Sequence, residues 1–300
     1  MCCLFGMIDH GQNFSGRQKS KMMSALATAC EARGTDATGI AYNGKNSLLV
    51  RKRPVAAHQM RFCIPNQASV IMGHTRMTTQ GSARKNRNNH PFLGAAGGTS
   101  FALAHNGVLY NDTYLRQHAK LPMTNIETDS YVAVQLIEKK RALTFASLKY
   151  MAEEVEGSFC FTVLDDKNIL YFVKGDNPLC IYYYPRLGLY LYASTEDILR
   201  AGISQMHITL GRPKKITLAY GDILRIDSNG TQIVETFHPD RFHVIQNDFF
   251  DWPSKATADY YDDLRTFAGT CGYGQDAVDL WLREGFSPDE IEEFLYCGEL

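Results

Sequence analysis

Short runs of apolar, aromatic and β-branched residues dominate the first 240 positions, and they constrain the fold more than any other feature of this sequence. Several are almost continuously apolar, which is typical of strands that are buried on both faces. We therefore predict strands over residues 39–42, 47–51, 69–75, 101–105, 158–164, 169–174, 180–184, 189–193, 222–226 and 232–237.

Three stretches carry apolar residues at helical spacing instead, over residues 19–32, 127–140 and 143–155. Two of these helices are adjacent, and strands do not alternate with helices as they do in a parallel sheet. The pattern predicts an α+β protein with two stacked, mainly antiparallel sheets that helices cover. Residues 165–168 and 228–230 have the composition of hairpin turns.

The charge of the chain is unevenly distributed. The formal net charge is -1, but residues 251–300 hold 12 acidic and 3 basic side chains, so this part is -9 and the rest is +8. We therefore expect one domain over residues 2–250 and an acidic helical extension over residues 251–300. Residues 287–290 form a capping box that predicts a helix to about Tyr296, and a faint 13-residue repeat predicts a similar short helix before it.

Several classes of protein are excluded by the composition. No Lys/Arg stripe with interleaved aromatic residues is present, so we expect no nucleic acid partner. No apolar run approaches the roughly 20 residues that span a bilayer. The eight cysteines form no CxxC pair and no secretory signal precedes them, which predicts a soluble cytoplasmic protein without metal or cofactor. Two basic clusters are interpreted as solvated surface: Arg51, Lys52, Arg53 and Arg61, then Arg84, Lys85 and Arg87.

Cys2 directly follows the initiator methionine, and a residue this small normally permits removal of that methionine. Removal leaves a thiol and a free α-amine on one residue. The α-amine has a pKa of about 7.7–8.0 and the thiol one of about 8.5, so the proton exchange between them is nearly balanced. An N-terminal nucleophile uses this pair to attack an amide. By itself, however, Cys2 is more typical of an ordinary or lipid-modified cysteine.

Six segments that include Cys2 occur in one order along the chain. Together they resemble the glutaminase domain of class II glutamine amidotransferases, as found in glucosamine-6-phosphate synthase and glutamine phosphoribosylpyrophosphate amidotransferase. The resemblance covers roughly residues 2–240 and implies a four-layer αββα N-terminal-nucleophile fold. The segments are Cys2-Cys3-Leu4-Phe5-Gly6, Arg33-Gly34-Thr35-Asp36-Ala37-Thr38-Gly39, Gly73-His74-Thr75-Arg76-Met77-Thr78-Thr79-Gln80-Gly81, Asn89-His90-Pro91-Phe92, His105-Asn106-Gly107 and Glu127-Thr128-Asp129.

The resemblance implies a catalytic set around Cys2. Asn106, through its side-chain amide, and Gly107, through its backbone N–H, form an oxyanion hole for the tetrahedral intermediate. Gly107 also contacts the substrate. Arg33 supports the backbone of the nucleophile. Asn106-Gly107 is equally compatible with a tight turn after a strand, and such a turn is how a backbone N–H becomes exposed.

The same resemblance implies a binding set for free L-glutamine. Arg76 binds the α-carboxylate through its planar guanidinium, and Asp129 pairs with the α-ammonium. The residues beside Arg76 that also contact the substrate are Met77, Thr79 and Gln80. Without the resemblance, a lone Arg or Asp is usually a surface charge.

The sequence departs from the family pattern in three places: Cys3 replaces Gly, Met77 replaces Trp and Gln80 replaces His. Residues 241–300 are too few for a synthase domain, so we expect a stand-alone glutaminase that passes ammonia to a separate acceptor or synthase, with residues 255–300 as a docking segment. An amidase for another small amide and a glutamine-sensing module without turnover are the alternatives. Residues 94–98 lack the Lys-Ser/Thr ending of a phosphate loop and are predicted to form a flexible loop over the site.

Overall fold

The computed structural model describes residues 2–238 and, beyond them, residues 264–265, 268–269, 273–274, 276–284, 286, 291 and 294–295. The chain divides into two compact units at residue 239. In the second unit, helix α8 spans Ala277–Glu284 and overlaps the first half of the predicted repeat. The capping box at residues 287–290 and the helix expected from it lie outside the described residues, apart from isolated positions.

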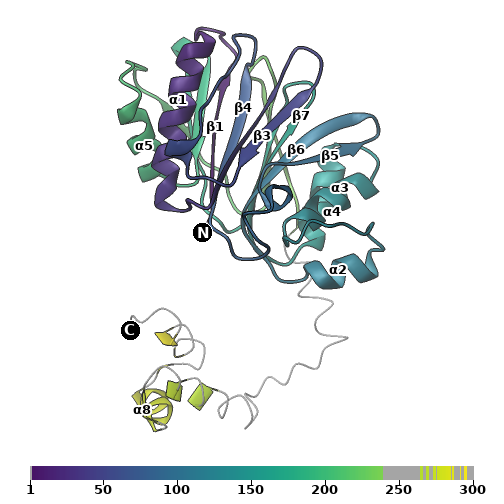
Figure 1. Ribbon diagram of the computed structural model, residues 1–300, viewed down its shortest axis with the longest axis vertical. Coiled ribbons are helices and arrows are strands. Elements are labelled where there is room, and N and C mark those ends of the chain that lie inside the picture. The colour runs from purple at the N-terminus through teal and green to yellow at the C-terminus, as the bar shows by residue number, and fades with distance from the viewer. Residues whose placement is uncertain are drawn as a thin grey trace. The chain divides into compact units, whose positions relative to one another are not determined.

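Residues 2–238 form two antiparallel sheets that stack face to face (Figure 1). The first sheet has the strand order β11-β9-β10-β1-β4-β2-β3, and the second has the order β13-β12-β8-β7-β6-β5. The first comprises β1 (Cys3–Asp9), β2 (Ala37–Asn43), β3 (Leu48–Arg53), β4 (Val70–Arg76), β9 (Cys180–Tyr184), β10 (Leu189–Ala193) and β11 (Lys214–Ile216). The second comprises β5 (Phe92–Ala96), β6 (Thr99–Leu109), β7 (Gly157–Asp165), β8 (Leu170–Lys174), β12 (Asp222–Ile226) and β13 (Gln232–Thr236).

Helices cover the outer faces of both sheets (Figure 1). α1 (Gly16–Ala29) and α5 (Glu196–Gln205) pack on the first sheet, and α3 (Tyr131–Lys139) and α4 (Phe145–Glu154) pack on the second. α2 (Asp112–His118) follows β6. The predicted α+β class and the four-layer αββα arrangement are confirmed. Among the described residues, no helix is long and apolar enough to cross a membrane.

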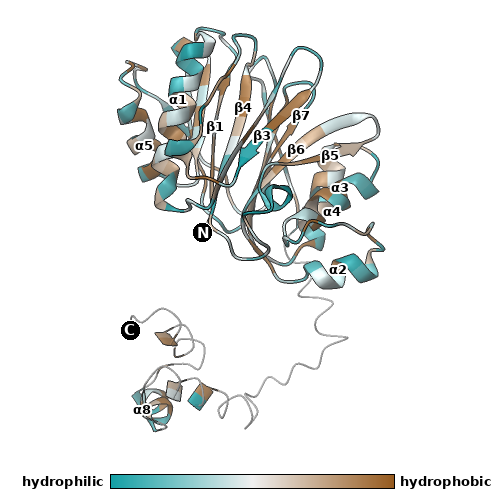
Figure 2. Ribbon diagram, in the orientation of Figure 1, coloured by the Kyte–Doolittle hydropathy of each residue, from teal (hydrophilic) through white to brown (hydrophobic). Residues whose placement is uncertain are grey.

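Side-chain alternation along β1 shows how one strand serves two layers. Cys3 and Phe5 belong to the core between the first sheet and α1 and α5, whereas Leu4 and Ile8 belong to the core between the two sheets. Successive strand residues point to opposite faces, so a continuously apolar segment is required in such a central strand. Figure 2 shows the resulting apolar strands inside and the more polar helix surfaces outside.

The ten predicted strands and three predicted helices are all present; β9, β10 and β12 have the predicted bounds, and the other elements have shifted ends. The prediction for residues 94–98 was wrong, because β5 and a turn into β6 occupy them. Gly94 lets β5 lie close to the Phe101 ring, because a Cβ at this position would lie 2.5 Å from that ring. Sequence reasoning also missed five elements: β1, β5, β11, α2 and α5.

Candidate active site

Cys2 lies immediately before β1, between the neighbouring strands β10 and β4. Its side chain is buried, and its Sγ atom lies 3.5 Å from the Met77 carbonyl oxygen. Arg33 donates from Nε to the Cys2 carbonyl oxygen at 2.9 Å. Arg33 directly follows the 3-10 turn Cys30–Ala32 that continues α1, so the helix places this guanidinium. The position of Cys2 is therefore fixed both by the strand that follows it and by Arg33.

The two neighbouring thiols occupy different environments. Burial raises the pKa of the Cys2 thiol, and the Met77 backbone and the Arg76 guanidinium partly offset this effect. The Cys3 side chain points into the helix-facing core, where its Sγ lies 2.9 Å from Cys30 Sγ. The Cys3 thiol therefore does not compete with the Cys2 thiol as the nucleophile, because it lies in the helix-facing core.

Arg76 ends β4 and is almost fully buried. Its Nη1 donates to Asn89 Oδ1 at 2.7 Å, and its Nη2 donates to the carbonyl oxygens of Gln80 and Gly81 at 2.5 and 3.1 Å. A guanidinium has five N–H groups, so these three contacts orient the group and, among the described residues, leave two N–H donors without a partner. Burial lowers the pKa of Arg76, and the acidic groups of Cys2, Asp129 and Asp36 act in the opposite direction. The predicted nucleophile and both predicted charge partners of glutamine thus share one electrostatic environment.

The loop after Arg76 contributes backbone rather than side chains. Met77, Thr79 and Gln80 are all exposed, and Met77 and Gln80 make their contacts to Cys2 and Arg76 through carbonyl oxygens. Asp36 holds the start of the loop, because its Oδ2 accepts from Thr78 N at 2.7 Å. The departures at positions 77 and 80 therefore change exposed side chains and leave these backbone contacts available.

Asp129 is buried just before α3. Its carboxylate accepts from Leu109 N at 2.7 Å and from Ser130 Oγ at 3.3 Å. Ser130 Oγ also lies 2.8 Å from His105 Nδ1, so this carboxylate is tied to both ends of the β6 segment that carries the predicted oxyanion hole. Burial lowers the pKa of His105, which favours the neutral ring.

Asn106 and Gly107 lie on β6, a strand that packs against β1 and β4. Asn106 is fully buried, and neither its Nδ2 nor its Oδ1 has a hydrogen-bond partner within the described part of the chain. Gly107 has a φ of 143°, and a Cβ there would lie 1.9 Å from Ser158 O. Only glycine fits this backbone. A buried amide normally has a hydrogen-bond partner, so the unpartnered donor and acceptor of the Asn106 side chain point to a ligand.

Three residues that sequence reasoning missed support this arrangement. Asn89 orients Arg76 and, through its carbonyl, accepts from the Lys52 ammonium. Ser130 contacts Asp129, and Asn177 donates from Nδ2 to the Asn106 carbonyl at 3.1 Å. Asn89 stands inside one of the six ordered segments and could have been found there. Asn177 lies 71 positions from its partner, and no local pattern marks it.

Burial also acts on the bases around Arg76. It lowers the pKa of Lys52 to about 8, with the nearby Arg76 charge as a second cause. It lowers the pKa of His74 to about 3. In the part of the chain that the structure describes, no group of three or more His, Cys, Asp or Glu side chains is placed to hold a metal ion.

Comparison with known proteins finds relatives of this chain. Residues 74–201 match the glutamine amidotransferase domain family. The chain is 32% identical over 162 residues to glutamine--fructose-6-phosphate aminotransferase of Listeria innocua, a match that covers 50% of this chain and 26% of the relative. It is 31% identical over 191 residues to the Bacillus thuringiensis protein of the same name, with 60% and 30% covered.

The fold is similar to that of a solved structure, glutamine phosphoribosylpyrophosphate amidotransferase from B. subtilis, with a TM-score of 0.61 at 20% identity. This match covers 79% of the chain and 49% of that protein. The matched stretches thus span less than a third of the curated relatives and about half of the solved structure. Residues 74–201 of this chain thus carry a glutamine amidotransferase domain, and the chain is homologous to part of these amidotransferases.

Proposed function

We propose that this domain hydrolyses L-glutamine to glutamate and ammonia through a thioester on Cys2. The observation that carries the proposal is the set of groups around Cys2. They are two buried, opposite charges on Arg76 and Asp129 and an amide on Asn106 that has no hydrogen-bond partner among the described residues. Free glutamine offers the complement, with a carboxylate, an ammonium and an amide that becomes an oxyanion.

The raised pKa of the Cys2 thiol means that it holds its proton at neutral pH and needs a base. After removal of Met1, the α-amine of Cys2 takes that proton, and the sulfur attacks the side-chain amide carbon of glutamine. The Asn106 amide and the Gly107 N–H stabilise the negative oxygen. The amide C–N bond then breaks, the α-ammonium returns the proton, and ammonia leaves. Water hydrolyses the thioester, which releases glutamate and restores the thiol.

The binding step uses the two buried charges. The N–H groups of Arg76 that its protein contacts leave over bind the α-carboxylate, and Asp129 binds the α-ammonium. Arg33 acts as a positioning residue, since its Nε donates to the backbone carbonyl of Cys2.

A glutaminase assay on processed protein tests the proposal. Cys2→Ala should abolish ammonia release, and Cys3→Ala is the matched control because its thiol lies in the helix-facing core. Intact-mass measurement should show that Met1 is absent from active protein. An active Cys2→Ala variant, or an active protein that retains Met1, would disprove the mechanism.

Two further measurements separate the alternatives. An amidase for another small amide should release product faster from acylated amines than from glutamine. A sensing module should bind glutamine tightly without forming a thioester. The three sequence departures that favour sensing leave the described backbone contacts of Met77 and Gln80 available, which supports catalysis.

We further propose that the ammonia passes to an acceptor or synthase outside residues 2–238, and that residues 255–300 dock this acceptor or synthase. The six cysteines that the structure describes are free thiols, which supports a reducing compartment such as the cytoplasm.

A further inference from the structure

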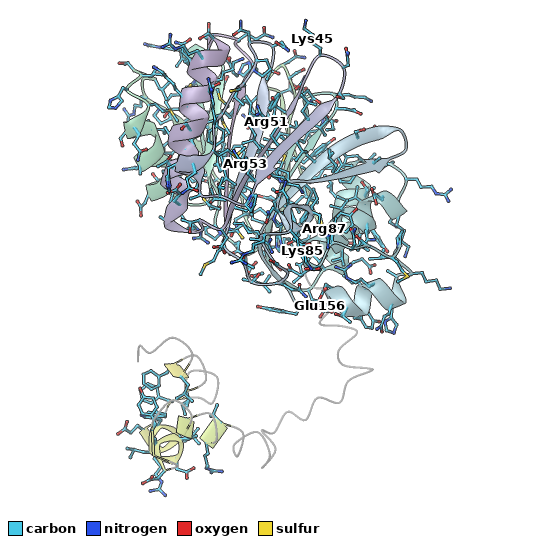
Figure 3. The ribbon with its side chains drawn as sticks, viewed as in Figure 1. Lys45, Arg51, Arg53, Lys85, Arg87 and Glu156 are labelled. Atoms are coloured by element: carbon cyan, nitrogen blue, oxygen red, sulfur yellow. The ribbon has the colours of Figure 1, made fainter. Side chains whose placement is uncertain are left out.

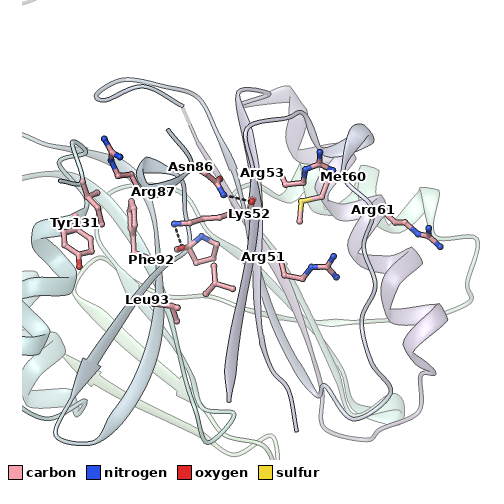
Figure 4. A pocket seen from close by; sticks show the side chains of 13 residues that line it. Arg51, Lys52, Arg53, Met60, Arg61, Asn86, Arg87, Phe92, Leu93 and Tyr131 are labelled. Carbon is pink, nitrogen blue, oxygen red and sulfur yellow. Dashed lines mark hydrogen bonds between the residues drawn. The ribbon is translucent and has the colours of Figure 1, made fainter. Parts of the chain in front are cut away.

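A cavity of about 600 Å³ lies where the edge strand β3 of the first sheet approaches the edge strand β5 of the second (Figure 4). Its lining contains none of the predicted glutamine-site residues and no Asp or Glu. Five of its lining residues are cationic: Arg51, Lys52, Arg53, Arg61 and Arg87. The structure thus brings together members of two basic clusters that are separate in the sequence, and Figure 3 shows Arg51, Arg53 and Arg87 on the same face.

The five cations are not equally available. Lys52 donates to the Asn89 and Pro91 carbonyls, and Arg87 lies 3.8 Å from Glu127. Arg51, Arg53 and Arg61 are exposed, and none of them pairs with a carboxylate among the residues that the structure describes. In Figure 4, these three arginines lie on the opposite side of β3 from Phe92.

Charged side chains commonly protect an edge strand from pairing with another chain, and this explains charge on β3 itself. It does not explain Arg61, which lies between the 3-10 turn Ala57–Gln59 and β4 and reaches the same cavity. Arg51 and Arg53 are two positions apart on one strand, so their Cα atoms are about 7 Å apart and their side chains share a face. Three guanidinium groups that have no carboxylate partner among the described residues repel one another in one concave lining, and an anion removes that repulsion.

We propose that this cavity binds a small molecule that carries two or more linked phosphate groups. A guanidinium fork matches phosphate oxygens in a bidentate manner, and three forks require more anionic oxygens than one phosphate supplies. The volume lies within the roughly 300–1,000 Å³ of small-ligand pockets. Met60, Ile126, Leu93 and Tyr131 also line the cavity and provide apolar contact for the non-phosphate part of such a ligand.

The cavity shares a segment of chain with the glutamine site. Asn86, Arg87 and Pro91 line it, and Asn89 between them holds the Arg76 guanidinium. Lys52, another lining residue, donates to the Asn89 carbonyl. A ligand against this segment therefore acts on the residue that orients Arg76, and we expect it to change the KM for glutamine more than kcat. This consequence rests on the proposed glutaminase activity, whereas the binding itself does not.

Isothermal titration of the full chain with inorganic tripolyphosphate tests the site. We expect saturable one-to-one binding that weakens as NaCl is raised, and at least about tenfold weaker binding by Arg51→Glu/Arg53→Glu. Arg61→Gln, from the other segment, should weaken it as well. Arg186→Glu/Arg212→Glu is the charge-matched control, since both residues are exposed and lie outside the lining. Circular dichroism verifies that each variant is folded.

Two further titrations identify the ligand class. ATP that binds more tightly than tripolyphosphate identifies a nucleotide, and the reverse order identifies an inorganic polyphosphate. No binding of either probe by the wild type, or equal loss in the control variant, overturns the site. A duplex DNA that binds more tightly than both probes, with the same dependence on Arg51 and Arg53, overturns the small-molecule assignment.

Glutamine kinetics at saturating tripolyphosphate test the coupling. A changed KM in the wild type and an unchanged KM in Arg51→Glu/Arg53→Glu support it. An unchanged KM in protein that binds tripolyphosphate overturns the coupling and leaves the binding site standing. Failure of the glutaminase proposal is recognised separately, because it appears as absent ammonia release without any added phosphate.

Discussion

At the scale of single residues, the unpartnered side-chain amide of Asn106 is the feature that most clearly indicates a ligand site. Asn106 is fully buried and its amide is unpartnered within the described residues, which costs about 1–3 kcal/mol for such a group. Its neighbours keep it there: Asn177 bonds the Asn106 carbonyl, and Gly107 adopts a backbone conformation that no larger residue fits. A protein keeps such an amide unpaired when the partner is a ligand.

We predict that Asn106→Ala lowers kcat for glutamine by about 10²–10³ and changes KM little, because the oxyanion exists only in the transition state. Steady-state ammonia release measures both constants. Asn111→Ala is the matched control: Asn111 is another buried asparagine, and its Nδ2 donates to Glu154 O at 2.9 Å. This control should lose stability and keep kcat. Equal kcat in Asn106→Ala and the wild type would contradict the oxyanion role.

At the scale of elements, α1 is joined to the end of β1 by a buried ion pair. Lys19 Nζ lies 3.1 Å from Asp9 Oδ2, and both side chains are almost completely buried. Lys19 also donates to the Asn66 and Ala68 carbonyls, and Asp9 accepts from the Asn13 backbone. These bonds compensate for the desolvation of both charges. They also fix the helix whose far end presents Arg33 to Cys2.

Lys19→Met should therefore lower the free energy of unfolding by about 3–5 kcal/mol, because it leaves the Asp9 carboxylate buried without a cation. Denaturant unfolding provides the measurement. The exposed Lys21→Met on the same helix should stay within about 0.5 kcal/mol of the wild type. Asp9→Asn/Lys19→Met should recover part of the loss. If both single lysine variants unfold alike, the ion pair does not hold the helix.

Elements with a strong local pattern could be predicted from the sequence, and those that depend on partners could not. The apolar run of β7 and the helical spacing of α1 were recognised directly. β11 is only three residues, Lys214–Ile216, two of them exposed, and becomes a strand because it pairs with β9. In the site, Arg76, Asp129 and Asn106 stood in recognisable segments. Their supports, Ser130 and Asn177, became visible only when distant strands were brought together.

At the scale of the whole molecule, three buried histidines connect the two sheets. His74 on β4 donates from Nε2 to the His105 carbonyl oxygen on β6 at 2.9 Å, and its ring centroid lies 4.2 Å from that of His90. Burial lowers the pKa of His74 to about 3, and it also lowers the pKa values of His90 and His105. The folded protein therefore keeps these rings neutral at pH values where the unfolded chain binds protons.

Because unfolded histidine has a pKa of about 6.5, this contribution to stability is complete above that pH and is lost as the pH falls toward about 3. We predict that the free energy of unfolding falls between pH 6.5 and 5 by up to about 1.4 kcal/mol per pH unit for each histidine. His90→Phe should reduce this slope by about the contribution of one histidine. The substitution His118→Phe, at an exposed position, should leave the slope unchanged. A stability that is constant over this range would contradict the prediction.

The two compact units have separate described cores, and this decides what a truncation should do. Among the described residues, the three core clusters of the first unit contain no residue beyond Phe237, and the fourth cluster begins at Leu264. We therefore predict that a chain ending at residue 250 melts at the same temperature as the full chain and keeps its kcat and KM for glutamine, although its net charge changes from -1 to +8. Scanning calorimetry and ammonia release measure these quantities.

If residues 255–300 dock an acceptor, the truncated chain should hydrolyse glutamine normally and lose only acceptor-dependent transfer of ammonia. Loss of glutamine hydrolysis itself would instead show that the acidic segment belongs to the catalytic domain.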